Sequence, residues 1–341
     1  MRFYSIGILL TLVMLSFISC KKTNELPNSS INQLRTDGAV LPVHIHGNKN
    51  SDVAIVVVHG GPGESGILKR DAVGLYRLEE DHLVVYYDQR ASGISEGNVN
   101  KESLTIEQMA HDLEAVVELV DEITDVSAIF ILSLDWGGAI AATYLTGNTL
   151  NPKVNGYIAS APGFNARKNM FAMRDTLQSL ANLITINDPE AENVLQNFLN
   201  QNLFVNAFNY QEHYRVVDGL LGITFNTNYT TAPVDLPAYT KRSVENNQQY
   251  VMENLKFQEN HFLFDMDVEP LLPLIPVPTK LIWGSHDLLF PVKLAGDYGE
   301  QLGLASDAEQ VSIFNFSAHR PYYEEGDRFY ATVATWISFF D

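Results

Sequence analysis

Three polar side chains that could carry out chemistry stand directly after apolar runs. Asp135 lies between such a run and a pair of glycines in "ILSLDWGGA", Asp287 ends "LIWGSHD", and His319 follows the last apolar run in "FNFSAHRP". A carboxylate that attacks a saturated carbon forms an ordinary alkyl ester, and a histidine oriented by a second carboxylate can activate water to hydrolyse that ester. We therefore expect Asp135 as the nucleophile, His319 as the base and Asp287 as its orienting acid.

Each of these residues also has an interpretation without chemistry. Asp287 could form an Asx turn and His319 could be a surface histidine. Asp135 could simply cap the helix that follows it, because a carboxylate is favourable at a helix start. Ser133 is a poorer nucleophile candidate, since it precedes the crest of the turn. A protein that binds a ligand without turnover therefore stays open as an alternative.

The elements that must position these residues alternate between strand-like and helix-like segments. An amphipathic helix is expected from Thr105, which can form a capping box with Gln108, and a closing helix is expected over 327–340. A strand that breaks into a helix within a residue or two forces its central side chain outward, and Asp135 holds that position. The alternation predicts an α/β fold with a mostly parallel sheet flanked by helices. Strands are expected at 53–60, 82–88, 126–132, 154–160, 279–284 and 310–316.

The alternation stops in a long central segment. Between residues 163 and 271 the composition shifts to Asn, Gln, aromatic residues and helix formers, as in "MFAMRDTLQSLANLI". An insertion of this length after a core strand predicts a helical cap over 163–271 that roofs the site. The core of the fold is then expected from residues 37–162 and 272–341.

The N-terminus is similar to a bacterial lipoprotein signal. Arg2 precedes a short apolar stretch that ends at "FISC", and Cys20 is the one cysteine of the chain. The resemblance implies a signal peptide over 1–19, lipidation of Cys20, a polar tether over 20–36, and a cell-envelope location in which the lipid anchor is the contact with the membrane. Which membrane carries the anchor is left open, as is self-association.

The charge of the chain argues against several partners and cofactors. Its 22 basic and 41 acidic residues give a net charge of −19, which repels nucleic acid and anionic lipid surfaces. The sequence contains no dinucleotide fingerprint or metal-binding cluster, and "GGPGESG" lacks the Lys-Ser/Thr of a phosphate loop. We expect neither a cofactor nor a metal, and a small molecule or short peptide as substrate.

Three motifs give the chain a family resemblance. "HGGPG" at 59–63, "DQRASGIS" at 88–95 and "DWGG" at the turn resemble the α/β-hydrolases, and within them the proline iminopeptidase group, although Ala91 stands where a glycine is usual. The resemblance implies that the backbone N–H groups of Gly61 and Trp136 form an oxyanion hole. It also implies the chain order nucleophile, acid, histidine. "DQRASGIS" is assigned no chemistry beyond bracing loops around the site.

Asp135 departs from the serine that an iminopeptidase would carry there. A carboxylate attacking a peptide carbonyl would give a mixed anhydride, which offers no easy path to amide cleavage. "DWGG" also resembles the aspartate elbows of epoxide hydrolases and haloalkane dehalogenases, but beyond Trp136 the second halide donor of a dehalogenase is missing. The expected activity is thus a cofactor-independent, epoxide hydrolase-like hydrolase. A catalytically inactive, ligand-binding relative of a serine aminopeptidase, or peptidase or esterase activity by another mechanism, are the alternatives.

Epoxide opening also needs an acid for the departing oxygen. The family resemblance implies cap tyrosines in this role, and none of those in the predicted cap can be singled out by sequence. The candidates are Tyr210, Tyr214, Tyr229, Tyr239 and Tyr250.

Overall fold

A computed structural model describes most of the predicted core and part of the predicted cap. It covers residues 29–97, 99–181, 189–200, 217–218, 220, 222–234, 266–304 and 310–340. The predicted signal peptide, Cys20 and four of the five cap tyrosines lie outside the described residues; Tyr229 lies within them. Within these ranges, no helix is long and apolar enough to cross a membrane.

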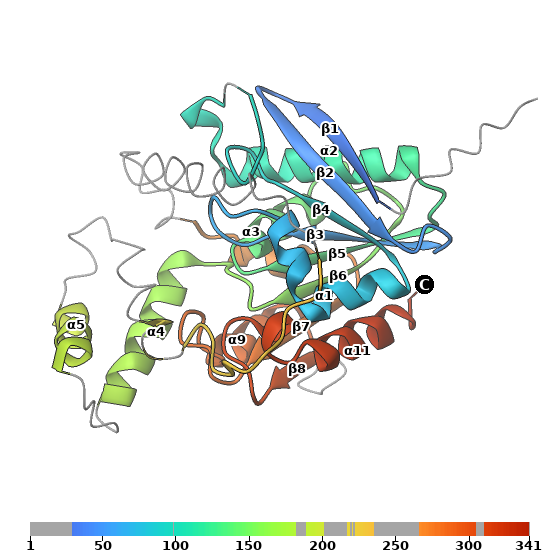
Figure 1. The fold of residues 1–341 in the computed structure, drawn as a ribbon. Coiled ribbons are helices and arrows are strands. Elements are labelled where there is room, and N and C mark those ends of the chain that lie inside the picture. Colours follow the sequence, from blue (N-terminus) through green and yellow to red (C-terminus); the bar gives the residue numbers. More distant parts are fainter. Residues whose placement is uncertain are drawn as a thin grey trace, which may run out of the picture.

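The core is one sheet of eight strands in the order β1-β2-β4-β3-β5-β6-β7-β8 (Figure 1). From β4 to β8 all neighbouring strands are parallel, whereas β1 and β2 pair antiparallel at one edge. Each of the six predicted strands is present, and the predicted α/β class is confirmed. The strands are β1 Ser29–Thr36, β2 Ala39–Gly47, β3 Val53–Val58, β4 Leu83–Tyr87, β5 Ala128–Leu134, β6 Val154–Ser160, β7 Thr279–Gly284 and β8 Val311–Phe314.

The first strand corrects the predicted tether. We expected a flexible segment over 20–36, but Ser29–Thr36 forms β1 and pairs along its whole length with β2. The prediction failed because β1 is a mostly polar edge strand in which Leu34 packs against the core while Ile31 is 59% exposed. Its backbone hydrogen bonds to β2, rather than a run of apolar side chains, hold it in the sheet.

Helices cover both faces of the sheet. Two clusters of buried hydrophobic side chains hold these helices on the sheet. One cluster includes α2, α3 and α9 on one face of the sheet, and the other includes α1 and α11 on the opposite face (Figure 1). The helices, including 3-10 turns labelled η, are η1 Ile67–Asp71, α1 Val73–Tyr76, η2 Arg77–Glu80, η3 Lys101–Ser103, α2 Ile106–Ile123, α3 Gly137–Leu145, α4 Ala166–Ala181, α5 Pro189–Asn200, η4 Glu269–Leu274, α9 Lys293–Gln301, α10 Pro321–Glu324 and α11 Gly326–Ile337.

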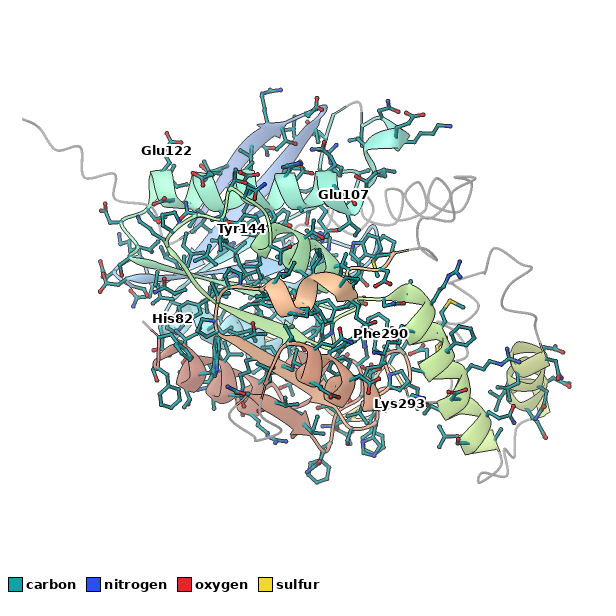
Figure 2. The ribbon with its side chains drawn as sticks, turned by 180° about the vertical axis from the view of Figure 1, so that it is seen from behind. His82, Glu107, Glu122, Tyr144, Phe290 and Lys293 are labelled. Carbon is teal, nitrogen blue, oxygen red and sulfur yellow. The ribbon has the colours of Figure 1, made fainter. Side chains whose placement is uncertain are left out.

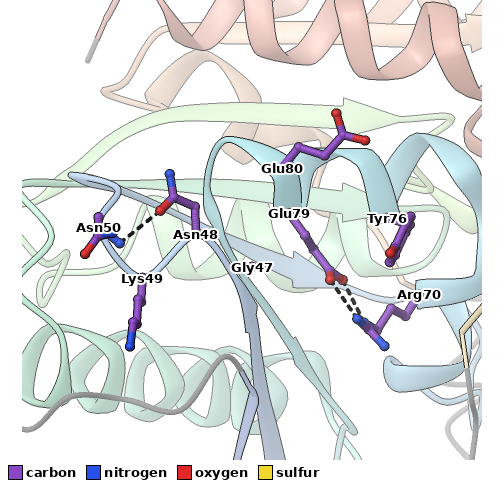
Figure 3. Close-up of a pocket in the computed structure, with 8 residues that line it drawn as sticks. All are labelled: Gly47, Asn48, Lys49, Asn50, Arg70, Tyr76, Glu79 and Glu80. Atoms are coloured by element: carbon purple, nitrogen blue, oxygen red, sulfur yellow. Dashed lines mark hydrogen bonds and ion pairs between the residues drawn. The ribbon is translucent and has the colours of Figure 1, made fainter.

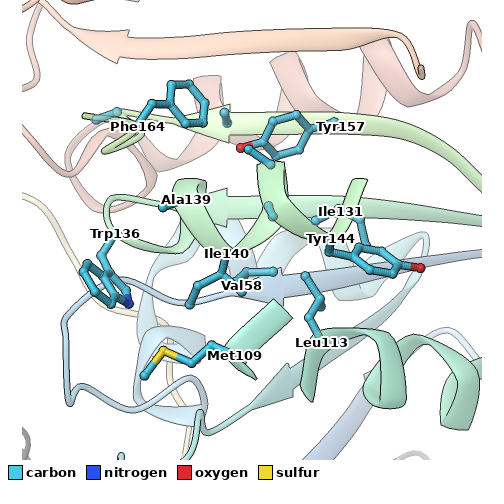
Figure 4. Close-up of a cluster of buried hydrophobic side chains, with 14 of the residues drawn as sticks. Val58, Met109, Leu113, Ile131, Trp136, Ala139, Ile140, Tyr144, Tyr157 and Phe164 are labelled. Carbon is cyan, nitrogen blue, oxygen red and sulfur yellow. The ribbon is translucent and has the colours of Figure 1, made fainter. Parts of the chain in front are cut away.

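Helix α2 begins where the sequence predicts. The Thr105 side chain accepts a hydrogen bond from the Gln108 N–H at 3.2 Å and so caps the helix. Met109 and Leu113 from its apolar stripe meet Ile140 of α3 in one buried cluster (Figure 4). The packing of α2 on α3 fixes the helix that starts just after Asp135.

The described part of the cap lies to one side of the sheet. Helices α4 and α5 project from the core there (Figure 1), and Lys293 at the start of α9 lies 3.4 Å from an Asp175 carboxylate oxygen of α4 (Figure 2). The loop-like segment "TFNTNYTTAPVDLP" at 224–237 is described up to residue 234, and this part contains no helix or strand apart from an isolated bridge between Thr231 and Ala72. Within the described residues of the predicted cap, helices α4 and α5 agree with the helical structure that was expected there.

Ala91 has an unusual backbone conformation that yields a stability prediction. Its φ is 53°, in the left-handed region that costs an alanine roughly 1–2 kcal/mol and costs a glycine little. We expect Ala91→Gly to raise the free energy of unfolding by about 1 kcal/mol, measured by urea denaturation. The control is Ala331→Gly on the exposed face of α11, which should instead lower it by about 1 kcal/mol. Destabilisation by both changes would contradict the prediction.

Candidate active site

The turn between β5 and α3 presents Asp135 at its crest. Asp135 has a φ of 51°, and its backbone is held from three directions. Its N–H donates to the Ser160 carbonyl at 3.1 Å, while its carbonyl accepts from the N–H groups of Gly138 and Gly163, each at 2.9 Å. These bonds hold a strained residue in place, and such strain is typical of a nucleophile turn.

The structure brings the three predicted side chains together. The His319 Nδ1 lies 2.9 Å from an Asp287 carboxylate oxygen, and its Nε2 lies 3.9 Å from the Asp135 Oδ2. Asp287 comes from the loop after β7 and His319 from the loop after β8. The other Asp287 oxygen accepts the Phe290 N–H at 2.8 Å, which fixes the carboxylate. The three side chains thus lie in the spatial order Asp135, His319, Asp287, which is the order that the predicted roles require.

Burial and charge act in opposite directions on these groups. Burial opposes a charge on the imidazole, but the carboxylates of Asp287 and Asp135 outweigh it and raise the pKa of His319 to about 10. Burial also raises the pKa of Asp287 above its ordinary value, although His319 and the Phe290 N–H act against this. Asp287 and Asp135 thus both favour the imidazolium form of His319.

This charge arrangement makes the stability of the fold depend on pH. The pKa of His319 rises from 6.5 to about 10 on folding, so its stabilisation is complete below about pH 6.5 and is lost as the pH rises through about 10. We expect the free energy of unfolding to fall across this window, by on the order of a few kcal/mol, and to fall much less in His319→Gln. Denaturant unfolding of both proteins at several pH values tests this. Parallel pH profiles would refute the assigned ion pairs.

The loop after β3 faces the same carboxylate. The Gly61 N–H donates to the Asp135 Oδ2 at 3.4 Å, so the predicted oxyanion donor points at the nucleophile. Gly61 has a φ of 142°, and a Cβ on Gly60 would lie 2.8 Å from the Asp135 Oδ2, so neither position accepts a side chain without strain. Trp136 is the last residue before α3, which places its N–H at the helix start.

The His59 side chain holds this loop through hydrogen bonds. It is fully buried, and burial lowers its pKa to about 4, so the ring is neutral. Its Nε2 accepts the Gln89 N–H at 3.1 Å, which leaves Nδ1 as the protonated nitrogen that donates to the Gly60 carbonyl at 2.7 Å. Histidine in "HGGPG" thus ties the oxyanion loop to the motif that begins at Asp88.

The "DQRASGIS" segment braces the site, as the sequence suggested. The buried Asp88 carboxylate accepts the Ser65 hydroxyl at 2.8 Å and the Gly66 N–H at 2.7 Å, just beyond the oxyanion turn. Arg90 forms a bidentate ion pair with Asp112 of α2, with both N···O distances 2.7 Å and the two side chains 0% and 1% exposed. These contacts link the loop to the sheet and to α2.

Glu324 is a structural partner of the site that sequence reasoning missed. Its buried carboxylate accepts the N–H groups of Phe225 and Asn226 at 2.7 Å each, and that of Ala318 at 3.0 Å. It thereby joins the segment 222–226 to the loop that carries His319, whose own N–H donates to the Ile223 carbonyl at 3.2 Å. An acidic residue shortly after the histidine was the available signal, but its partners are remote in sequence.

Two other features carry no chemistry. The Ser133 hydroxyl is buried and bonds to the Tyr157 hydroxyl at 2.8 Å, so it is turned toward the core. A surface pocket of about 480 Å³ beside η2 contains none of the predicted site residues, and its Arg70 and Glu79 neutralise each other through two bonds of 2.8 Å (Figure 3). Within the described ranges, no cluster of three metal-ligating side chains occurs.

The chain is similar in sequence to known hydrolases. The sequence profile of a family described as "Serine aminopeptidase, S33" matches residues 49–217. "Probable aminopeptidase YbaC" of Bacillus subtilis (strain 168) is 23% identical over 308 residues, which cover 85% of this chain and 90% of that protein. The proline iminopeptidase of Heyndrickxia coagulans is 21% identical, over 83% of this chain and 90% of the relative.

A solved structure extends the likeness to the fold. The crystal structure of proline iminopeptidase from Mycobacterium smegmatis superposes with a TM-score of 0.64 at 17% identity, covering 91% of this chain and 98% of that one. The sheet topology and this superposition show the α/β-hydrolase fold. Together with the hydrolase family and relatives, they indicate that it is a hydrolase.

Proposed function

We propose that the chain is a hydrolase in which Asp135 attacks a saturated carbon and forms an alkyl ester, which His319 then hydrolyses through water. The observation that supports this most directly is the place of a carboxylate at the crest of the strained turn, with Nε2 of His319 3.9 Å away and the Gly61 N–H at 3.4 Å. The ester carbonyl formed at Asp135 would then have an oxyanion donor beside it.

The names of the relatives suggest peptide substrates, but the Asp135 side chain argues for different chemistry here. An aspartate that attacked an amide would form a mixed anhydride, whereas attack on an epoxide or alkyl halide forms a stable ester. An epoxide hydrolase-like activity on a small molecule is therefore the function that fits this site. We also propose anchoring through a lipid on Cys20, with the site held at the cell envelope.

Trapping of the ester tests the proposed reaction. The His319→Gln variant lacks the base for the second step, so an adduct should accumulate on the peptide that carries Asp135 after exposure to a panel of epoxides and alkyl halides. Mass spectrometry of the digested protein detects this adduct. The absence of any adduct across both classes, with ligands still bound, would favour an inactive ligand-binding relative instead.

A further inference from the structure

The surroundings of His319 define which proton faces the nucleophile. Its Nδ1 is bonded to Asp287 at 2.9 Å, so Nε2 is the nitrogen directed at Asp135, 3.9 Å from the Oδ2. The imidazole is 5% exposed, and the Phe290 ring meets it edge to face with centroids 5.1 Å apart. A proton on Nε2 is therefore enclosed beside the Asp135 carboxylate.

We propose that His319 is also the acid of the first step, and that the substrates of this site are consequently epoxides, whose leaving oxygen needs a proton, rather than alkyl halides. This inference rests on the proposed function, since it assigns an acid to the reaction in which Asp135 is the nucleophile.

The first step balances with the groups that the site holds. The Asp135 carboxylate forms a bond to one epoxide carbon, and the bond from that carbon to the ring oxygen breaks. The oxygen keeps the bonding electrons and takes the Nε2 proton of His319. The products are a β-hydroxyalkyl ester on Asp135 and a neutral imidazole whose Nδ1 proton still bonds Asp287.

The second step restores the starting state. Neutral His319 takes a proton from water, and the hydroxide adds to the ester carbonyl of Asp135, whose oxyanion the Gly61 N–H can bind. Collapse of the adduct expels the diol oxygen as an alkoxide, which takes the proton of the new Asp135 carboxyl group. Asp135 thus returns to the carboxylate and His319 is again the imidazolium. One water is consumed, no proton is gained or lost, and the same histidine serves as acid and then as base.

An alkyl halide leaves this proton cycle incomplete. Halide departure needs no proton, so the first step would produce an ester beside an imidazolium that cannot accept a proton from water. Hydrolysis would have to wait until His319 lost its proton to solvent. The resting site thus matches a leaving group that is protonated as it departs.

The charges around His319 support a resting imidazolium. Asp287 from the β7 loop and Asp135 from the β5 turn raise its pKa to about 10 against the opposing effect of burial. Arg320 is its neighbour in the chain, and Glu324 of α10 is engaged with three backbone N–H groups. Formation of the ester removes the charge of Asp135 and with it one cause of the raised pKa, which favours the neutral base when it is needed.

Tyr229 offers a comparison with the usual source of this proton. Among the cap tyrosines that the structure describes, its ring packs against that of Tyr323, with centroids 5.5 Å apart. No contact with Asp135 or His319 is found for it within the described residues. His319, in contrast, places its Nε2 3.9 Å from the Oδ2 of Asp135.

A matched pair of alkylating probes tests the assignment. Wild type, His319→Gln and Asp135→Asn are each incubated with 1,2-epoxyhexane or 1-bromohexane. The adduct on the peptide that carries Asp135 is followed by mass spectrometry, and the released diol or alcohol is counted with it, because the wild type hydrolyses its ester. In His319→Gln the epoxide adduct should still accumulate, because the second step is blocked, but its formation should slow by at least about 100-fold, because a general acid contributes about 10²–10⁴-fold. Bromide alkylation should slow far less than epoxide alkylation, because halide departure needs no proton, and circular dichroism checks that the variant is folded.

The outcomes separate this inference from the function on which it rests. Adducts from both probes at wild-type rates in His319→Gln would overturn the role of acid while keeping Asp135 as the nucleophile. Adducts from neither probe in any protein would overturn the nucleophile itself. If His319→Gln reacted with neither probe while the wild type reacted, the pH profile of the wild type would decide. Epoxide alkylation should fall as the pH rises through about 10, whereas bromide alkylation should not. Identical pH profiles for the two probes would refute the proposal.

Discussion

The Asp135→Asn variant is expected to lose adduct formation and turnover almost completely, by a factor on the order of 10⁴–10⁶. An uncharged amide is a poor nucleophile, and it cannot form the alkyl ester. Asparagine tolerates the left-handed backbone that a φ of 51° demands, so the turn should persist. Single-turnover assays with the probe that labels the wild-type protein, together with circular dichroism to confirm folding, measure the effect.

A second substitution at the same position provides the control. Asp135→Ser places a hydroxyl near His319, Asp287 and the Gly61 N–H, an arrangement suited to acyl transfer. We expect this variant to lose alkylation and to gain hydrolysis of an activated acyl ester such as p-nitrophenyl acetate. Wild-type turnover retained by Asp135→Asn would show that another residue is the nucleophile.

Arg90→Met should cause the largest loss of stability, about 3–5 kcal/mol of unfolding free energy. The change leaves Asp112, 1% exposed, without its counter-ion inside the packed region between the "DQRASGIS" loop and α2. Methionine keeps much of the side-chain volume, so the loss reports mainly the uncompensated charge. Urea denaturation of the purified variant gives the value.

An exposed ion pair serves as the matched control for this effect. Arg77 bonds Asp327 at 2.8 Å, but the two side chains are 33% and 81% exposed. Arg77→Met should therefore change stability by less than about 1 kcal/mol. Replacing both buried partners, as in Arg90→Met with Asp112→Leu, should recover part of the loss. A loss below about 1 kcal/mol for Arg90→Met alone would contradict the argument.

Much of the fold could be predicted because its strands are buried on both faces. Such strands must be apolar at every position, as in Val53–Val58, and continuous apolar runs are visible without knowledge of their partners. Strand Ser29–Thr36 shows the opposite case, because its place depends on backbone bonds to β2 and its side chains are mostly polar. The sequence therefore determined the interior of the sheet and its class, but not its edge.

The candidate site, like the fold, could be predicted from the sequence only in part. The positions of Asp135, Asp287 and His319 after β5, β7 and β8 could be predicted, because the carboxyl ends of parallel strands meet at one edge of a sheet. Only the tertiary structure decided the distances from His319 to its two carboxylates, and that Glu324 holds the His319 loop through Phe225 and Asn226. A motif records local chain geometry, whereas charge interactions and hydrogen bonds between remote segments depend on distances that arise only when the chain is folded.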